Sequence, residues 1–120
     1  MNAEKNNALA ILRTLEILSA ELGADAPLTY VRTLVLVATA GDAGMDQGEL
    51  TRRLDLSPSG TVRAVQALGK FSWQKDEHGN KKPGLDLIDA VQNAQNYRLR
   101  TLTLTAKGRK LMAKLTGGGK

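Results

Sequence analysis

The side chains that could support catalysis or hold a metal are few in this chain. The single histidine, His78, lies in an Asp-Glu-His-Gly-Asn run typical of an exposed turn, with no further metal ligands at a useful spacing. Asp86 and Asp89 could act as a carboxylate pair in acid–base catalysis. They have no histidine, lysine or metal-binding companion in the pattern, so an exposed strand edge is the simpler interpretation. The glycines form no phosphate-binding loop. We therefore expect neither an enzyme nor a bound cofactor.

Residues 57–71 suggest a different chemistry, that of a helix whose polar face can recognise bases. Ser57 is a typical N-cap and Pro58 suits the first helical position, so two start signals follow each other. An arginine on such a face can reach guanine, and a glutamine can pair with adenine or a phosphate. An ordinary solvated helix surface carries similar residues, so the face alone does not decide. The polar face, opposite the core on a helical wheel, carries Ser59, Arg63, Gln66 and Lys70.

The other side of the same helix is expected to pack into the core. Its members are Thr61, Val62, Val65 and Leu68. Small residues beside the polar face would let the helix approach a groove closely, and these are Gly60, Ala64 and Ala67.

A shorter helix is expected immediately before this one. Asp46 and Glu49 match a D-x-x-E capping box, and the helix behind them would bury Leu50 and Leu54. Asp55-Leu56 would then turn the chain. Two short helices joined by a tight turn are how a helix-turn-helix presents its second helix to the DNA major groove. The basic residues exposed on the first of the two helices would be Arg52 and Arg53.

Two more helices are expected on the N-terminal side of this unit. Residues 3–22 carry an apolar stripe at steps of three and four residues, which Gly23 ends. The near-heptad spacing favours packing against the same helix of a second subunit, and the alternative is a helix folded back onto its own core. Pro27 starts a second helix, apolar on most sides and therefore central, which ends at Gly41 and Gly44. The stripe consists of Ala8, Ile11, Leu12, Leu15, Leu18 and Leu22.

A polar segment and two strands are expected beyond residue 71. Residues 72–83 have no helical periodicity, with a turn at Gly79-Asn80 and a breaker at Pro83. Alternation and turn residues then predict the remaining elements. These are a short strand at 85–88, a polar turn at 92–96, a strand at 97–104, a helix capped by Thr105 and running to Leu115, and a flexible tail at 116–120.

Composition limits the classes of protein to which the chain can belong. With 120 residues and 42% apolar content, it can bury the core of one small domain. Its net charge of +5 suits a polyanionic partner without requiring one. Cysteine is absent, which excludes thiol redox chemistry, disulfides and thiolate metal sites. No apolar run reaches the roughly 18 residues of a membrane span and no signal peptide is visible, so a cytoplasmic protein is expected.

Three segments resemble the MarR type of bacterial winged helix-turn-helix regulator. They are 48–59 (GELTRRLDLSPS), 96–98 (NYR) and 102–108 (LTLTAKG). The resemblance implies a mainly α fold with a small β-hairpin (α+β), a winged helix-turn-helix whose terminal helices form a dimer interface. The chain would divide into a dimerisation helix at 1–24, the winged helix-turn-helix at 25–104 and a C-terminal helix with tail at 105–120. By matching position, the DNA contacts would come from Ser57, Ser59, Thr61 and Arg63 in the major groove and from Arg98 at the wing.

The chain departs from that family's pattern around the wing. Asn96 stands where the family usually has aspartate, which weakens the ion pair that braces the wing. The family strand that starts with Gly-Leu begins here at Gly84, so 72–83 is an insertion. The N-terminal helix is short for the family and leaves little room for a ligand pocket, which argues against a small-molecule sensor.

The insertion has two interpretations. It could extend the DNA-contacting surface or dock another protein, with Trp73 anchoring its base. It could also be a solvated loop with Trp73 in the core. The basic residues that would contact DNA in the first case are Lys75, Lys81 and Lys82.

The leading expectation is a dimeric, sequence-specific regulator of transcription that binds double-stranded DNA. Arg52, Arg53 and Lys70 would contact phosphates, whereas base recognition would come from Ser59, Arg63 and Gln66. Two alternatives remain. One is a winged-helix protein-interaction module of phage or plasmid type, for example one that binds a polymerase. The other is a non-specific or single-strand DNA-binding protein, against which the low aromatic content speaks.

Overall fold

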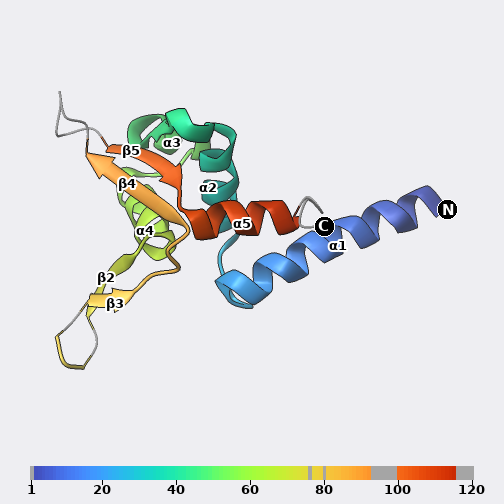
Figure 1. Cartoon of the computed structure of the whole chain (residues 1–120), viewed down its shortest axis with the longest axis horizontal. Coiled ribbons are helices and arrows are strands. Elements are labelled where there is room, and N and C mark those ends of the chain that lie inside the picture. Colours follow the sequence, from blue (N-terminus) through green and yellow to red (C-terminus); the bar gives the residue numbers. More distant parts are fainter. Residues whose placement is uncertain (1, 76, 80, 93–99, 116–120) are drawn as a thin grey trace.

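The structure, a computed structural model, describes residues 2–75, 77–79, 81–92 and 100–115. Within these ranges the chain forms five α-helices, a 3-10 turn and two antiparallel sheets (Figure 1). The fold is mainly helical with little sheet, as the sequence predicts. The helical elements are α1 (Asn2–Leu22), α2 (Leu28–Thr39), η1 (Gly41–Ala43), α3 (Gln47–Leu54), α4 (Pro58–Leu68) and α5 (Ala106–Leu115). The strands are β1 (Met45–Asp46), β2 (Phe71–Lys75), β3 (Lys81–Pro83), β4 (Ile88–Gln92) and β5 (Arg100–Leu104).

Helix α2 is the centre of the core, as predicted. Leu34 and Val37 have no exposed surface, and the helix packs against α3, α4 and β5. Leu28 and Val35 are exposed, so α2 is not covered on all sides. The other four helices and both outer strands of the larger sheet contribute to this core, together with β5 and the segment before β4. The buried apolar residues from these parts are Leu18, Met45, Leu50, Leu54, Val65, Leu68, Leu87, Ile88, Leu102 and Leu111.

Strand β5 is the middle strand of a three-stranded antiparallel sheet, between β1 and β4. Met45 pairs with Leu102, which is fully buried, and Ile88 pairs with Leu104. Two residues are too few to show a period-two alternation, so the sequence does not reveal β1. The strand expected at 85–88 begins only at Ile88. Residues 93–99 and 116–120, with most of the expected turn, the start of the expected second strand and the expected tail, lie outside the described residues.

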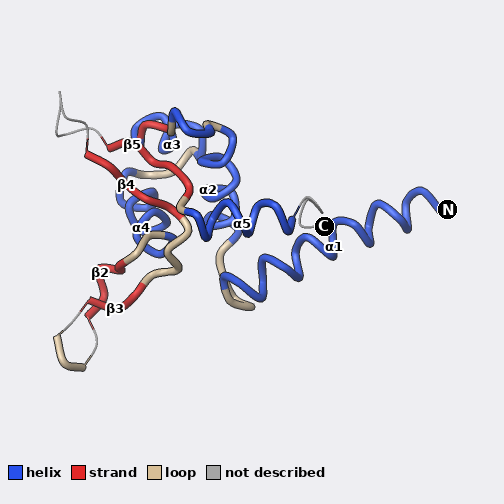
Figure 2. Tube along the Cα trace, viewed as in Figure 1, coloured by secondary structure: helices blue, strands red, loops and turns tan. Residues whose placement is uncertain are grey.

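Residues 72–83, for which the sequence predicts only a turn, contribute to a second, two-stranded sheet. β2 and β3 pair antiparallel, with Phe71 opposite Pro83 and Lys75 opposite Lys81. Gly79, with φ 82°, lies in the predicted turn. Figure 2 shows the hairpin as an extension beyond the helices. The polar composition of this segment concealed its strands, because a hairpin outside the core needs no apolar alternation.

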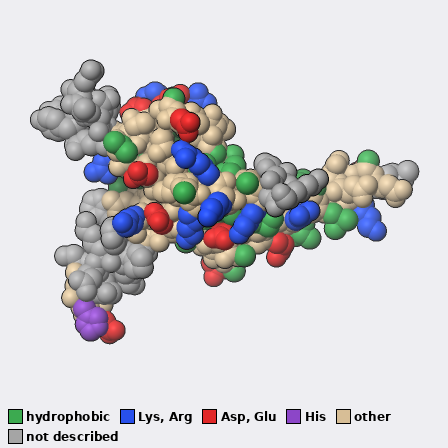
Figure 3. Space-filling view, in the orientation of Figure 1, with side chains coloured by type: hydrophobic (Ala, Val, Ile, Leu, Met, Phe, Trp, Pro, Cys, Tyr) green, Lys and Arg blue, Asp and Glu red, His purple; other side chains and the backbone are tan. Residues whose placement is uncertain are grey.

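Helix α1 occupies the predicted residues, but most of it extends away from the rest of the chain (Figure 1). Within it only Leu18 is buried, and its C-terminal part packs against α5. Leu22 is half-buried against the core, whereas the stripe from Ala8 to Leu15 is open to solvent. Figure 3 shows hydrophobic side chains along the helix. Its most exposed large members are Ile11 (61%), Leu12 (51%) and Leu15 (48%), and Leu9 beside the stripe is 54% exposed. None of the described helices has the length and apolar character to span a membrane.

Residues 84–87 cross the end of α4. Their four N–H groups donate to the carbonyl oxygens of residues 67–70 at 2.7 to 3.0 Å. Carbonyls at the C-terminal end of a helix have no partner inside the helix, so this segment supplies the missing donors. A Cβ on Gly84 would collide with the carbonyl oxygen of Gly69, so the close crossing requires glycine.

The same segment meets the start of α5 on its other side. Thr105 accepts a hydrogen bond from the N–H of Gly108 at 3.0 Å, which confirms the predicted cap. Its hydroxyl also donates to the carbonyl oxygen of Asp86 at 2.6 Å. Gly108 is buried, and a Cβ there would collide with the carbonyl oxygen of Leu87. Close contact between α5 and this segment therefore depends on Gly108.

We expect Gly108→Ala to lower the free energy of unfolding by about 1–3 kcal/mol, because the added methyl group overpacks this crossing. The loss would occur although alanine favours a helix over glycine by roughly 1 kcal/mol. Gly48→Ala in α3 is the matched control. The nearest atom to its Cβ is the carboxylate end of Asp46 at 3.1 Å, which can move aside. Urea denaturation of both variants is the measurement, and equal stabilities would contradict the tight contact at Gly108.

Candidate nucleic-acid interface

The turn between α3 and α4 is fixed by the backbone. Asp55 ends α3 in the left-handed conformation, with φ 55° and ψ 46°. The N–H of Leu56 donates to the carbonyl oxygen of Thr51 at 3.3 Å, which closes the turn. Leu50 and Leu54 are buried, as predicted. Helices α3 and α4 therefore share one core, and their packing fixes the orientation of α4.

The start of α4 is capped as the sequence predicts. The Oγ of Ser57 accepts a hydrogen bond from the N–H of Gly60 at 3.1 Å, and Pro58 opens the helix. The Oγ of Ser59 lies 3.1 Å from that of Ser57. Both serines are exposed, so two hydroxyl groups stand at the N-terminal end of α4. A helix N-terminus with exposed hydroxyl groups is well suited to contact phosphates.

The capping box predicted for α3 is wrong. Asp46 occupies the N-cap position, but its side chain makes no capping hydrogen bond. The backbone of Asp46 also belongs to β1, where it pairs with Thr101, so a non-local strand pairing constrains this helix start. Glu49 instead forms an ion pair with Arg53 one turn later, with Oε1 3.0 Å from the guanidinium. Arg52 and Arg53 are both exposed, as predicted.

The polar face of α4 is largely as predicted. Arg63 is exposed and Gln66 is half-buried. The helix ends at Leu68, before the predicted residue 71, so Lys70 is exposed just beyond it and Phe71 begins β2. Thr61, predicted from the wheel to face the core but matched to a DNA contact by family resemblance, has no exposed surface. Its hydroxyl donates to the carbonyl oxygen of Ser57 at 3.3 Å. Thr61 is therefore a core residue, and the prediction that it contacts DNA is wrong.

Two residues of α4 differ from their predicted burial. Ala64, expected beside the polar face, has no exposed surface, whereas Val62, expected in the core, is only half-buried. The core-facing side of the helix is therefore rotated by part of a turn from the predicted position. The rotation leaves a β-branched apolar side chain next to Arg63 on the accessible side. Such a side chain is suited to contact the methyl group of thymine.

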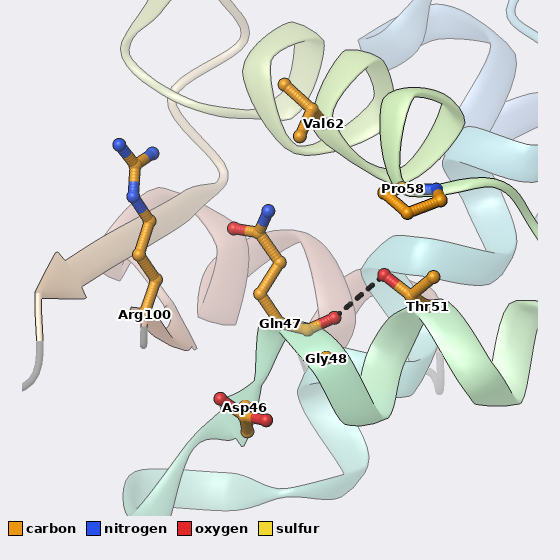
Figure 4. Close-up of a pocket in the computed structure, with 7 residues that line it drawn as sticks. All are labelled: Asp46, Gln47, Gly48, Thr51, Pro58, Val62 and Arg100. Atoms are coloured by element: carbon orange, nitrogen blue, oxygen red, sulfur yellow. Dashed lines mark hydrogen bonds between the residues drawn. The ribbon is translucent and has the colours of Figure 1, made fainter. Parts of the chain in front are cut away.

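An open groove of about 330 Å³ lies between the start of α3, helix α4 and the end of strand β5. Figure 4 shows Arg100 and Gln47 extending toward α4, from which Pro58 and Val62 face them. Arg100, an exposed residue of β5, was not among the predicted contacts. The sequence signal was available, because Arg98 and Arg100 occupy positions of the same parity on the predicted strand. The groove is lined by Asp46, Gln47, Gly48, Thr51, Pro58, Val62 and Arg100.

The remaining predicted contacts are placed only in part. Arg98 lies outside the described residues. Lys75, Lys81 and Lys82 belong to the β2–β3 hairpin, where the structure gives their backbone positions. Trp73 likewise lies within β2. Among the described residues, no group of three histidine, cysteine or acidic side chains could hold a metal ion.

A second hollow, of about 270 Å³, lies between the end of α1 and the start of α2. It is lined mainly by apolar residues that include Leu15, Leu18, Leu28 and Val31. The sequence predicts that the short N-terminal helix leaves little room for a ligand pocket. The structure nevertheless has this open hollow beside the helix. The exposed stripe of α1 runs directly into it.

A helix-turn-helix followed by an antiparallel hairpin on the same core defines a winged helix-turn-helix. No protein-family model matches the chain, and no curated protein matches its sequence. Solved structures do match. The Staphylococcus aureus MepR–DNA complex gives a TM-score of 0.67 at 16% identity, covering 98% of this chain and 82% of that chain. RV1404 from Mycobacterium tuberculosis gives 0.62 at 20%, covering 94% and 65%.

The protein MarR itself gives a TM-score of 0.58 at 17% identity, covering 98% of this chain and 77% of that chain. These structural neighbours are MarR-family regulators. The chain therefore has the MarR-like winged helix fold over nearly its whole length.

We expect Ser57→Ala to lower the free energy of unfolding by about 1 kcal/mol, because it removes the cap from α4. Asp46→Ala is the matched control at the other N-cap, and it should change stability by much less because no capping bond is lost. Chemical denaturation monitored by circular dichroism would measure both. A loss for Asp46→Ala as large as that for Ser57→Ala would contradict this account of the two helix starts.

Proposed function

We propose that this protein is a transcriptional regulator that binds specific double-stranded DNA as a homodimer. Helix α4 would enter the major groove, and the β4–β5 hairpin would be the wing near the minor groove. The observation that carries the proposal is the capped α4 with its exposed Ser59 and Arg63, held on a fold shared with a MepR structure determined with DNA. DNA binding in that neighbour supports the proposal by analogy of fold.

Base recognition would depend on Arg63, Ser59 and Gln66. Arg63 is exposed in the middle of α4 and can donate to the acceptors of guanine, whereas a hydroxyl and an amide can serve either base or phosphate. Val62 lies beside Arg63 and would add apolar contact. Specificity would therefore be concentrated in two turns of one helix.

Phosphate contacts would surround this face. Ser57 and Arg52 lie at the two sides of the turn, and Lys70 follows the end of α4. Arg53 would exchange its ion pair with Glu49 for a phosphate, at small cost because both side chains of this pair are solvent-exposed. Arg100 would add a cation at the base of the wing, and Arg98 stays a prediction for the wing itself.

The homodimer would form through α1. The stripe residues Ile11, Leu12 and Leu15 are uncovered in the described part of the chain, although the stripe has the near-heptad spacing of a helix that packs against another. Its C-terminal part already packs on α5, so a second copy could extend an existing helix–helix contact. A two-fold dimer would present two copies of α4 to successive major grooves.

The decisive experiment is selection of bound fragments from a random pool of double-stranded DNA, at about 150 mM salt so that non-specific binding is weak. An enriched inverted repeat, with half-sites about one helical turn apart, would establish a dimeric sequence reader. Binding without enrichment would contradict sequence recognition. No binding at all would contradict the proposed function.

We expect Arg63→Ala to weaken binding to the selected site by about 1–3 kcal/mol, with a much smaller effect on random DNA. The reason is that a base contact carries sequence information and a phosphate contact does not. Arg13→Ala, on the far side of α1 from its stripe, is the control that removes the same charge. Fluorescence anisotropy with both DNAs would measure the effect, and equal losses on the two DNAs would exclude base recognition by Arg63.

We expect Leu12→Glu to shift the protein from dimer to monomer, because it places a charge within the apolar stripe. Ala10→Glu introduces the same charge on the opposite side of α1 and should leave the dimer intact. Both positions are exposed in the single chain, so neither change should unfold the subunit. Sedimentation equilibrium would determine the oligomeric state. A dimer that tolerates Leu12→Glu would show that the stripe is not the interface.

A further inference from the structure

We infer that the β2–β3 hairpin is a second wing, whose outer lysines contact DNA phosphates beside the major groove that α4 enters. This inference rests on the proposed function and adds a surface to it. The residues concerned are Lys75 and Lys81, which pair at the end of the hairpin remote from α4, and Lys82, which lies between that pair and the base of the hairpin at Pro83.

The hairpin is attached to the recognition helix at both of its ends. Its first strand begins at Phe71, three residues after α4 ends, and β2 packs against that helix. Its second strand ends at Pro83, directly before the segment 84–87 that donates four hydrogen bonds to the end of α4. Both ends of the hairpin are therefore anchored to the last turn of α4. A surface attached in this way must follow α4 wherever the helix docks.

The direction of the hairpin suits a DNA contact. In the view of Figure 1, the hairpin and the β4–β5 wing both project at the end of the molecule remote from the N-terminus of α1, and α4 lies between them. Phe71 and Lys75 are four residues apart in β2, which corresponds to at most roughly 13 Å because the register shifts between them. The major groove of B-DNA is about 12 Å wide. A hairpin of this length can therefore reach from the recognition helix to a phosphate strand at the edge of the groove.

The charge of the hairpin favours an anionic partner. Residues 70–83 contain four lysines against one aspartate and one glutamate. The register places Lys75 directly opposite Lys81, and Lys82 follows. Like charges at paired positions destabilise an antiparallel ladder, and a two-stranded sheet has little stability to lose. Phosphates at the outer end would remove that cost, because they supply the opposite charge.

The test compares the double variant K75Q/K81Q with a control, R13Q/R32Q, that removes two exposed cations from α1 and α2. Binding of both variants and of the unaltered protein would be measured on the selected site and on a random duplex, from about 50 to 300 mM salt. Each lost phosphate contact should reduce the slope of log K against log salt by about 0.9. We therefore expect K75Q/K81Q to reduce the slope by about 2 on both DNAs, and the control to leave it unchanged. Thermal melting of the free variants would verify that they remain folded.

Three outcomes separate the possibilities. A smaller salt slope for K75Q/K81Q, with the same fold-loss of affinity on both DNAs, supports the second wing, because phosphate contacts carry no sequence information. An unchanged slope and affinity would overturn it. If the unaltered protein binds neither DNA, the proposed function fails, and the second wing fails with it.

Discussion

The four hydrogen bonds between residues 84–87 and the end of α4 are the constraint on which the rest of the fold depends. They satisfy carbonyl groups that the helix itself leaves without donors, at distances of 2.7 to 3.0 Å. Among the same four residues, Leu87 is buried in the core, and the carbonyl oxygen of Asp86 accepts a hydrogen bond from the Thr105 hydroxyl. They therefore fix the start of β4 beside the end of α4, and they fix the start of α5 against the same segment. The recognition helix, the wing and the C-terminal helix are all joined at this crossing.

The close contacts at this crossing account for the unusual backbone of the residues that form it. Gly84 and Gly108 approach carbonyl oxygens too closely for any side chain, and Asp86 adopts a positive φ of 57° although it is not glycine. Non-glycine residues in this conformation carry a cost that surrounding structure must offset. Here the N–H of Asp86 is bonded to Gly69 and its carbonyl to Thr105, so both polar groups of the strained residue are satisfied.

Features that depend on residues close in sequence could be predicted, and features that depend on distant ones could not. The caps at Ser57 and Thr105 each bond a backbone N–H three residues later, so a short motif contains the whole interaction. The failed capping box at Asp46 shows the opposite case, because its backbone is held by β5 more than 50 residues away. β1 and the crossing at 84–87 are pairings of the same non-local kind.

The candidate site divides in the same way. Exposure of Arg63 and burial of Leu68 follow from helical periodicity, which the sequence displays. The places of Val62 and Ala64 depend on the exact rotation of α4 against α2, which neighbouring helices decide. The position of Arg100 at the groove depends on β5 lying beside the start of α3, a consequence of sheet order. Thr61 could have been assigned correctly, because the wheel already placed it in the core.

The hairpin is an excursion that leaves and rejoins the chain at almost one point. Phe71 lies opposite Pro83, and the fold resumes at Gly84 as if the intervening residues were absent. Extending such a closed loop has a small entropic cost, about 0.6 kcal/mol for each doubling of its length. The length and sequence of the β2–β3 hairpin can thus change while α4, the wing and the core keep their geometry. Evolution, or an engineer, can remodel one surface of this protein independently of the helix beside it.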